Sequence, residues 1–145
     1  DNIALSWLAK KLDMSYDWYE NLMLCREEQT EWLAELIIDE YKKQSLPIVI
    51  LGKCFKKETN LTVGSPSILL SNILKEKNIE ATMYDPYIDS SEPPLKDKSI
   101  YFLGTNHDCF QDYKFPDGSV VINVWRMPLN YVGNFNHIKI GNSLK

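Results

Sequence analysis

The sequence contains no apolar run of about 18 residues, the length that a membrane-spanning helix requires, so a membrane-spanning protein is excluded. It also has no excess of basic residues. The net charge is -4 and the isoelectric point about 5.2, which argues against a nucleic-acid-binding surface. Cys25, Cys54 and Cys109 are an odd number without paired metal-ligand spacing. This pattern predicts reduced thiols in a cytoplasmic protein, each buried as a small hydrophobic residue.

Several catalytic signatures are missing as well. There is no G-x-G-x-x-G, no G-x-x-x-x-G-K-[ST], no nucleophile elbow and no zinc motif. A standard NAD-binding fingerprint and an NTPase phosphate loop are therefore excluded. His107, Asp108 and Cys109 are metal-ligand types, but adjacent residues in a turn rarely converge on one ion, so we expect no metal site.

The first third of the chain has helical periodicity. The 145 residues are 44% hydrophobic, enough for one sizeable core. Residues 1–12 predict a short helix. After Ser15, apolar residues recur every three or four positions, and no Gly or Pro interrupts them before Pro47. This spacing predicts a single helix of roughly 25 to 30 residues.

Beyond Pro47, short apolar runs alternate with polar turns. Strands are expected at residues 48–51, 79–84, 99–103, 119–124 and 137–140. A helix is expected at 65–77, with Ser65 as its cap, and a short helical segment at 107–112. The predicted fold class is α/β, in which a long helical lead-in (1–46) precedes an open, mostly parallel, Rossmann-like sheet domain (47–145).

Ligands of such sheets bind outside the carboxyl ends of the strands, here the loops 52–65, 85–89, 104–108 and 123–128. The first loop places three lysines beside a helix start, which suits phosphate, although a solvated surface loop would look the same. In this loop, Phe55 and Lys56 set an aromatic plane beside a cation. Asp85 is positioned either to hold ribose hydroxyls or to set a turn. Arg126 is suited to phosphate or to a surface salt bridge.

The motifs taken together resemble the carboxyl-terminal part of the UDP-glucose/GDP-mannose dehydrogenase family, most closely its UDP-glucose 6-dehydrogenase type. After a strand, that family has Gly-x-Ala-Phe-Lys-x-x-Thr-x-Asp-x-Arg-x-Ser-Pro, then a helix, a strand and Tyr-Asp-Pro. The matching residues here are Gly52, Phe55, Lys56, Thr59, Ser65, Pro66, Tyr84, Asp85 and Pro86. Residues 1–8 are similar to the segment that begins at the last Asp of the family's Cys-Phe-x-Lys-Asp motif. The likeness covers nearly the whole chain.

The resemblance implies an activity. The family oxidises the primary alcohol of a nucleotide sugar to a carboxylate by two hydride transfers to NAD, through a nucleophilic Cys. It implies that 1–46 are central helices that form a homodimer through Trp18, Trp32 and the long helix, and that 47–145 bind the UDP-sugar. The product would be a uronate for polysaccharide biosynthesis. Cys25, Cys54 and Cys109 match no position of the nucleophile, so residues 1–145 are expected to be inactive alone.

Site residues are implied by position. Phe55, Lys56 and Arg126 correspond to residues that contact the UDP-sugar, and Asp1 to the motif Asp that assists the Cys step. The family's Asp and Arg in Thr-x-Asp-x-Arg are replaced by Leu61 and Val63, and that Arg normally reaches the dinucleotide. No cofactor-binding residue is therefore assigned. An Asn of the long helix is replaced by Arg26.

Two hypotheses follow. In the first, the chain is part of an enzyme whose amino-terminal domain supplies NAD binding and the Cys, and a Cys-Phe-x-Lys or Cys-Phe-x-Arg sequence directly precedes Asp1. In the second, it is a stand-alone, non-catalytic nucleotide-sugar-binding or assembly module, and Leu61 and Val63 reflect the loss of redox function.

Overall fold

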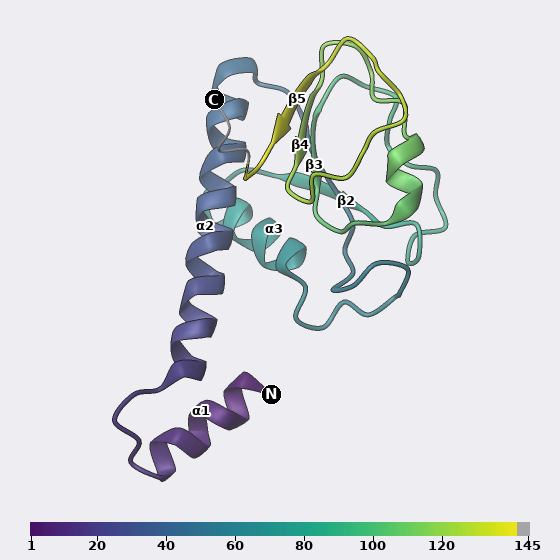
Figure 1. The fold of residues 1–145 in the computed structure, drawn as a ribbon. Coiled ribbons are helices and arrows are strands. Elements are labelled where there is room, and N and C mark those ends of the chain that lie inside the picture. The colour runs from purple at the N-terminus through teal and green to yellow at the C-terminus, as the bar shows by residue number, and fades with distance from the viewer. Residues whose placement is uncertain (142–145) are drawn as a thin grey trace.

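The protein was analysed as a computed structural model, which describes residues 1–141. A long helix lies along one side of a sheet domain and extends well beyond it, with a short helix folded back beside the projecting end (Figure 1). The elements are α1 (Asn2–Lys11), α2 (Trp18–Gln44), β1 (Ile48–Leu51), α3 (Pro66–Glu76), β2 (Ala81–Tyr84), β3 (Ile100–Leu103), the 3-10 helix η1 (Asp108–Asp112), β4 (Val120–Asn123) and β5 (Asn136–Lys139).

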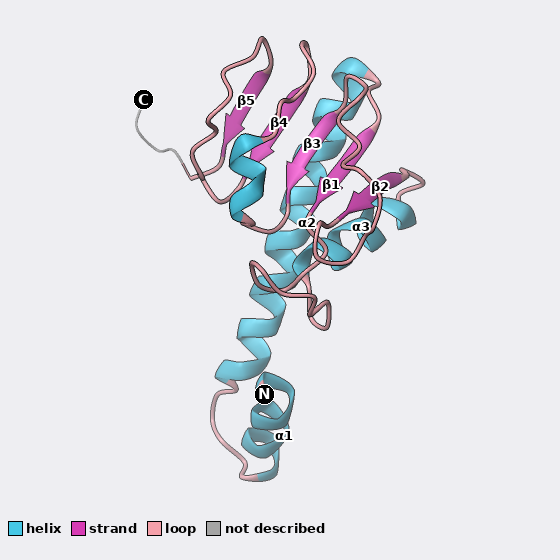
Figure 2. Ribbon diagram, turned by 90° about the vertical axis from the view of Figure 1, so that its right-hand side faces the viewer, coloured by secondary structure: helices cyan, strands magenta, loops and turns pink. Residues whose placement is uncertain are grey.

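The sheet has five strands in the order β2-β1-β3-β4-β5, and every neighbouring pair is parallel (Figure 2). The predicted α/β fold class with an open, parallel, Rossmann-like sheet is confirmed. The first strand, β1, lies between β2 and β3. The chain therefore adds β2 on one side of β1, then returns to add β3, β4 and β5 on the other side, so the strand order reverses between β1 and β3. In open α/β sheets this is the place where ligands bind.

The central strands are buried on both faces, as the continuous apolar runs predict. Successive side chains point to opposite faces. Ile48 and Ile50 face a core shared with α2 and α3, whereas Val49 and Leu51 face a second core that includes Phe110 of η1. Both cores depend on the same strands, so the sheet holds the loops at its carboxyl edge rigidly.

Helix α2 has 27 residues, within the predicted length. It begins where the Asp17 carboxylate accepts hydrogen bonds from the backbone N–H groups of Tyr19 and Glu20. It ends at Ser45, which adopts a left-handed conformation with φ 51°. Asp17 also accepts a 2.6 Å hydrogen bond from the Ser6 hydroxyl of α1, which fixes the two helices as a hairpin.

The predicted strand at 79–84 begins two residues too early. Asn78 has φ 59°, and the Ile79 N–H donates to Leu74 O at 2.9 Å, so Ile79 closes the end of α3 instead of starting a strand. The first ladder residue of β2 is Ala81, which pairs with Ile48. The apolar side chain of Ile79 still packs on the core, which explains why the sequence pattern extends over it.

Two further expectations concern exposure. Within the described residues, no helix combines the length and apolar character needed to cross a bilayer. All three cysteines are free, but the expectation that each is buried was wrong for Cys25 and Cys109, which are exposed. Cys54 is buried in the loop after β1.

Candidate functional site

Three of the four predicted loops start side by side. Leu51, the last residue of β1, pairs with Tyr84 of β2 and Leu103 of β3, so the loops after these strands begin at one level of the sheet edge. Gly52 opens the first loop with φ 102°, and a Cβ added there would lie 2.5 Å from Thr105 Oγ1. Glycine is required here for its conformation and for the close approach of the neighbouring loop.

Asp85 joins these loops. Its side chain is fully buried and accepts hydrogen bonds from the backbone N–H groups of Lys53 (2.6 Å), Cys54 (3.0 Å) and Tyr87 (2.9 Å). Burial raises the pKa of Asp85, but these donors together with His107 outweigh it and hold the pKa below its usual range. The turn-setting interpretation of Asp85 is therefore correct, because its oxygens are engaged inside the protein and not available to a ribose.

His107 completes this buried network. Its Nδ1 accepts a 2.9 Å hydrogen bond from the Glu58 N–H, so the ring proton lies on Nε2, which is 3.1 Å from Asp85 Oδ2 and donates to it. Sequence reasoning grouped His107 with Asp108 and Cys109, but those two side chains are exposed while His107 is fully buried. The network orders the lysine-bearing loop through the His107 contact with Glu58.

In the described part of the chain, Cys54, Asp85 and His107 form a cluster of metal-ligand types whose ligand atoms lie within 4.8 Å of one another. The hydrogen bonds of these residues indicate that the cluster has a structural role instead. His107 has no lone pair left for an ion, because Nδ1 is an acceptor and Nε2 carries the proton. Burial and the Asp85 carboxylate raise the pKa of Cys54 to about 12, so its thiol is neither a ready metal ligand nor a nucleophile at neutral pH.

The three lysines of the loop differ in their partners. Lys53 forms a 2.7 Å ion pair with Asp89, and Lys57 forms a 3.2 Å ion pair with Asp108. Across residues 1–141, no carboxylate lies within ion-pair distance of Lys56, whose side chain is exposed. Lys56 is thus the one lysine of this loop whose charge is not matched within the described residues.

An aromatic cleft of about 470 Å³ lies between α2, the start of α3 and the carboxyl ends of β1, β3 and β4. Three half-exposed aromatic side chains, Trp32, Phe55 and Trp125, line it together with apolar residues of both helices. Sequence reasoning found Phe55 but assigned Trp32 to a dimer contact. Trp32 belongs to the helix that crosses the sheet, and no local pattern distinguishes a cleft-lining Trp from an interface Trp.

The aromatic cleft also contains an unpartnered polar group. Ser67 is buried and lines the cleft beside Gly104, and its hydroxyl has no hydrogen-bond partner within residues 1–141. A Cβ on Gly104 would overlap Ser67 Oγ, so Gly104 makes room for this hydroxyl. Buried hydroxyls are nearly always paired, so the Ser67 hydroxyl retains an unused donor and acceptor at the wall of the cleft. Ser67 was missed from the sequence, where a serine in a first helical turn is unremarkable.

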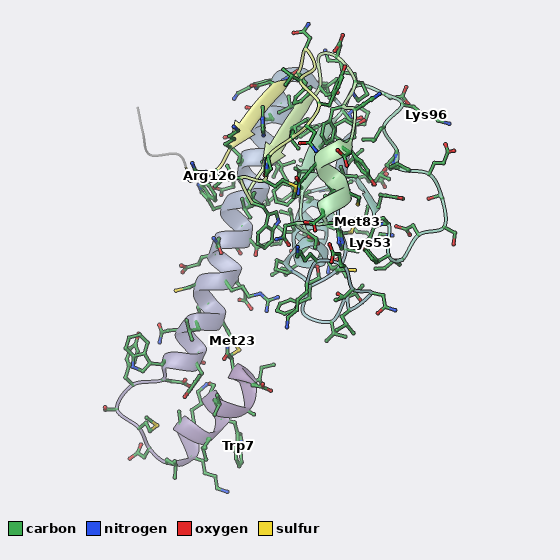
Figure 3. All side chains as sticks on the ribbon, turned by 45° about the vertical axis from the view of Figure 1, so that its right-hand side comes forward. Trp7, Met23, Lys53, Met83, Lys96 and Arg126 are labelled. Carbon is green, nitrogen blue, oxygen red and sulfur yellow. The ribbon has the colours of Figure 1, made fainter. Side chains whose placement is uncertain are left out.

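The predicted site residues are brought together only in part. Phe55 lines the aromatic cleft, and Arg126 follows Trp125, which also lines it. Arg126 has φ 54° and donates to Gly141 O at 3.4 Å; within residues 1–141 it forms no ion pair, unlike the surface salt bridge considered from sequence. Figure 3 shows Arg126 beside the tip of β5. Asp1 lies on a different element, exposed at the start of α1.

No protein-family profile matches the chain. In an alignment 101 positions long, which covers 63% of this chain and 23% of the relative, the chain is 25% identical to UDP-N-acetyl-D-mannosamine dehydrogenase of Methanococcus aeolicus. The solved structure of a UDP-D-ManNAc dehydrogenase from Pyrococcus horikoshii superimposes with a TM-score of 0.53 and 19% identity, over 73% of this chain and 30% of that one.

These similarities agree with the resemblance drawn from the motifs. The chain is similar to less than a third of the length of either protein. The likeness to the solved structure shows the fold, and the curated relative carries the sequence relationship. The resemblance to the UDP-sugar dehydrogenase family is thereby confirmed.

Proposed function

We propose that this UDP-sugar dehydrogenase-like chain is the UDP-sugar-binding part of an NAD-dependent dehydrogenase, with the aromatic cleft as its nucleotide site. The observation that carries the proposal is the position of the cleft. It lies at the carboxyl edge of a parallel sheet, where the strand order reverses, and Phe55 on its wall is followed by the unpaired Lys56.

Each part of the cleft matches one part of the ligand. The faces of Trp32, Phe55 and Trp125 offer flat apolar surface for a base or a sugar ring. The unpartnered Ser67 hydroxyl provides a hydrogen bond to a polar edge. Lys56 and Arg126 follow the lining residues Phe55 and Trp125 in the sequence. Both are free of carboxylate partners within residues 1–141 and would provide positive charge for the diphosphate at the edge of the cleft.

NAD, when bound, accepts the hydride from the sugar alcohol. The loop positions that contact the dinucleotide in the family do not fit that role here, because Leu61 and Val63 are exposed apolar residues, 60% and 91% accessible, and offer no charge. We therefore propose that NAD binding and the nucleophilic Cys are supplied from outside residues 1–145, that Asp1 assists the Cys step there, and that these residues alone do not turn over substrate.

The sugar is proposed from the relatives. Both matched proteins are named for UDP-N-acetyl-D-mannosamine, whereas the motif resembles the UDP-glucose 6-dehydrogenase type. We propose UDP-N-acetyl-D-mannosamine as the preferred ligand and UDP-glucose as the competitor to be measured against it. Because the two share the UDP group, their affinities should differ only through contacts to the sugar.

Calorimetric titration with UDP tests the site. Lys56→Ala should weaken UDP binding by about tenfold or more, as expected for the loss of a charge-assisted hydrogen bond. Lys57→Ala removes the same charge from the next residue, but Lys57 is paired with Asp108 and should leave the affinity within about twofold.

Equal losses of UDP affinity in the two lysine variants would mean that only the total charge of the loop matters, and would contradict a specific role of Lys56. Failure of the wild-type chain to bind UDP, UDP-glucose and UDP-N-acetyl-D-mannosamine would contradict the proposed site itself.

A second candidate function is a binding module without redox activity, which the apolar Leu61 and Val63 favour. The coding sequence directly upstream of Asp1 separates the two. A Cys-Phe-x-Lys or Cys-Phe-x-Arg sequence there supports the dehydrogenase, whereas a stop codon or an unrelated sequence supports the module.

We also propose that two copies associate through α1 and the first half of α2. Buried residues of α2 begin only at Thr30. Before it, the hairpin exposes large apolar side chains over both helices: Ile3, Trp7, Leu8, Leu12, Trp18, Leu22 and Leu24. An apolar surface of this kind is unusual on a monomer and typical of an interface.

A further inference from the structure

A second cleft lies on the other side of the start of α3. It has a volume of about 360 Å³, is formed by α1, α2 and α3, and is called here the α3 cleft. Figure 3 labels Met23, which lines it from α2, near the start of α1. One part of its wall is apolar, with Ile3, Ile68 and Leu69, and the other part is polar, with Arg26 and Ser65.

Ser65 supplies the first unusual feature. It is the N-cap residue of α3 and is 4% exposed, yet its hydroxyl does not cap the helix and has no hydrogen-bond partner in the described part of the chain. The N–H groups of Ser67 and Ile68 have no intrahelical acceptor because they belong to the first turn. An unpartnered buried hydroxyl and uncapped amides therefore lie together at the positive end of the helix dipole.

Arg26 supplies the second feature. Its guanidinium reaches from α2 to the loop before α3 and donates to Gly64 O. Within residues 1–141 it has no carboxylate partner, and a guanidinium has five N–H donors, so most of them are available. A cation is thus held beside the uncapped helix start, in a chain whose net charge of -4 supplies no general attraction for anions.

We propose that the α3 cleft is an anion site that binds the phosphate of a phosphorylated organic ligand. Arg26 would donate to its oxygens together with Ser65 and the first-turn amides, while the apolar wall would take the organic part. Glu27 also lines the cleft, and its negative charge opposes the anion. The site shares no lining residue with the aromatic cleft, so it stands independently of the proposed nucleotide site.

Titration of the whole chain with inorganic pyrophosphate tests this inference. Arg26→Gln should weaken binding by about tenfold or more, and Ser65→Ala by a smaller factor, since each removes a donor to the anion. Glu27→Gln should strengthen binding, because it removes a repulsive charge. Lys42→Gln, an exposed cation near the far end of α2, should leave the affinity unchanged.

The variant Trp32→Ala tests the two clefts independently, because Trp32 lines the aromatic cleft and not the α3 cleft. This variant should lose UDP affinity and retain pyrophosphate affinity if both sites exist. If the wild-type chain binds pyrophosphate but not UDP, only the nucleotide site is contradicted. If it binds both and Arg26→Gln leaves the pyrophosphate affinity unchanged, only the α3 cleft is contradicted. Absence of pyrophosphate binding, or equal losses in Arg26→Gln and Lys42→Gln, would overturn the inference.

Ser65→Ala also has a readout in the absence of ligand. Because the hydroxyl has no partner, its removal should leave the melting temperature unchanged or raise it. A clear decrease would show that the hydroxyl is engaged within the protein, and would count against its availability to an anion.

Discussion

At the scale of single residues, Asp85 holds the carboxyl-edge loops together. Its side chain is reached by the loop after β1 through Lys53 and Cys54, by its own turn through Tyr87, and by the loop after β3 through His107. Each donor favours the ionised carboxylate. The pKa of Asp85 is consequently lower in the folded chain than in the unfolded one.

Asp85→Asn should destabilise the fold by at least about 2 kcal/mol, because an amide nitrogen would face buried N–H donors and leave them unsatisfied. A group with a lowered folded pKa stabilises above its unfolded pKa, and this contribution is lost as the pH falls through the folded pKa. The stability gap between wild type and variant should therefore be largest at neutral pH and narrow below about pH 4. Urea unfolding at several pH values measures it.

The control is Asp39→Asn, which removes the same charge at an exposed position of α2 and should change stability little. A gap that did not change with pH would show that Asp85 titrates alike in the folded and unfolded chains, contrary to the network described.

At the scale of elements, the loop from Gly52 to Ser65 is shaped by two glycines in left-handed conformations. Gly52 has φ 102° and meets Thr105, whereas Gly64 has φ 76° and has no atom within 4 Å of an added Cβ. The two positions share the backbone conformation that disfavours other residues and differ in their surroundings. Substitutions at the two glycines therefore distinguish the cost of backbone strain from the cost of a steric clash.

Gly64→Ala should cost about 1 to 2 kcal/mol from backbone strain alone. Gly52→Ala should cost more, by about 1 to 3 kcal/mol, because the new methyl group also displaces the Thr105 loop. Thermal unfolding of the two variants measures the difference. Equal effects would mean that the Thr105 loop yields freely and that the sheet edge is less rigid than the packing indicates.

At the scale of the whole molecule, the sheet domain covers only half of α2. A helix of 27 residues is about 40 Å long, and its buried positions start at Thr30. The other half packs against α1, held by the Ser6–Asp17 hydrogen bond and the Lys10–Glu20 ion pair, and is linked to the sheet domain by the Arg26 hydrogen bond to Gly64 O. Trp18 and Leu22 lie one turn apart and exposed, which places them on one face of the unpartnered half.

Leu22→Glu should shift the proposed dimer toward monomer, with at least about tenfold weaker association, because a charge would be buried at an apolar interface. Light scattering during size-exclusion chromatography measures the mass. Leu61→Glu is the matched control, since Leu61 is 60% exposed and Leu22 53%, but it lies on the loop near the sheet. A monomeric wild type, or equal effects of both substitutions, would contradict association through this face.

Local periodicity predicted most elements. The spacing of apolar residues between Ser15 and Pro47 predicted the long helix, and continuous apolar runs predicted the buried strands, because burial on one stripe or on both faces leaves those periods in the sequence. The start of β2 was placed two residues too early because Ile79 is apolar in either role. The role of Asp85 was left open, since its donors come from residues 31, 32 and 22 positions away or from its own turn.

The sequence by itself determined the fold class and the family resemblance, since both depend on residue types at fixed spacings along one chain. Only the tertiary structure distinguished Lys56 from Lys53 and Lys57, because their partners, Asp89 and Asp108, come from other loops. Only the structure placed Trp32 and Phe55 on the wall of one cleft and Arg26 and Ser65 on the wall of another. Contacts between distant segments depend on how the sheet brings its edges and helices together, and no local pattern records them.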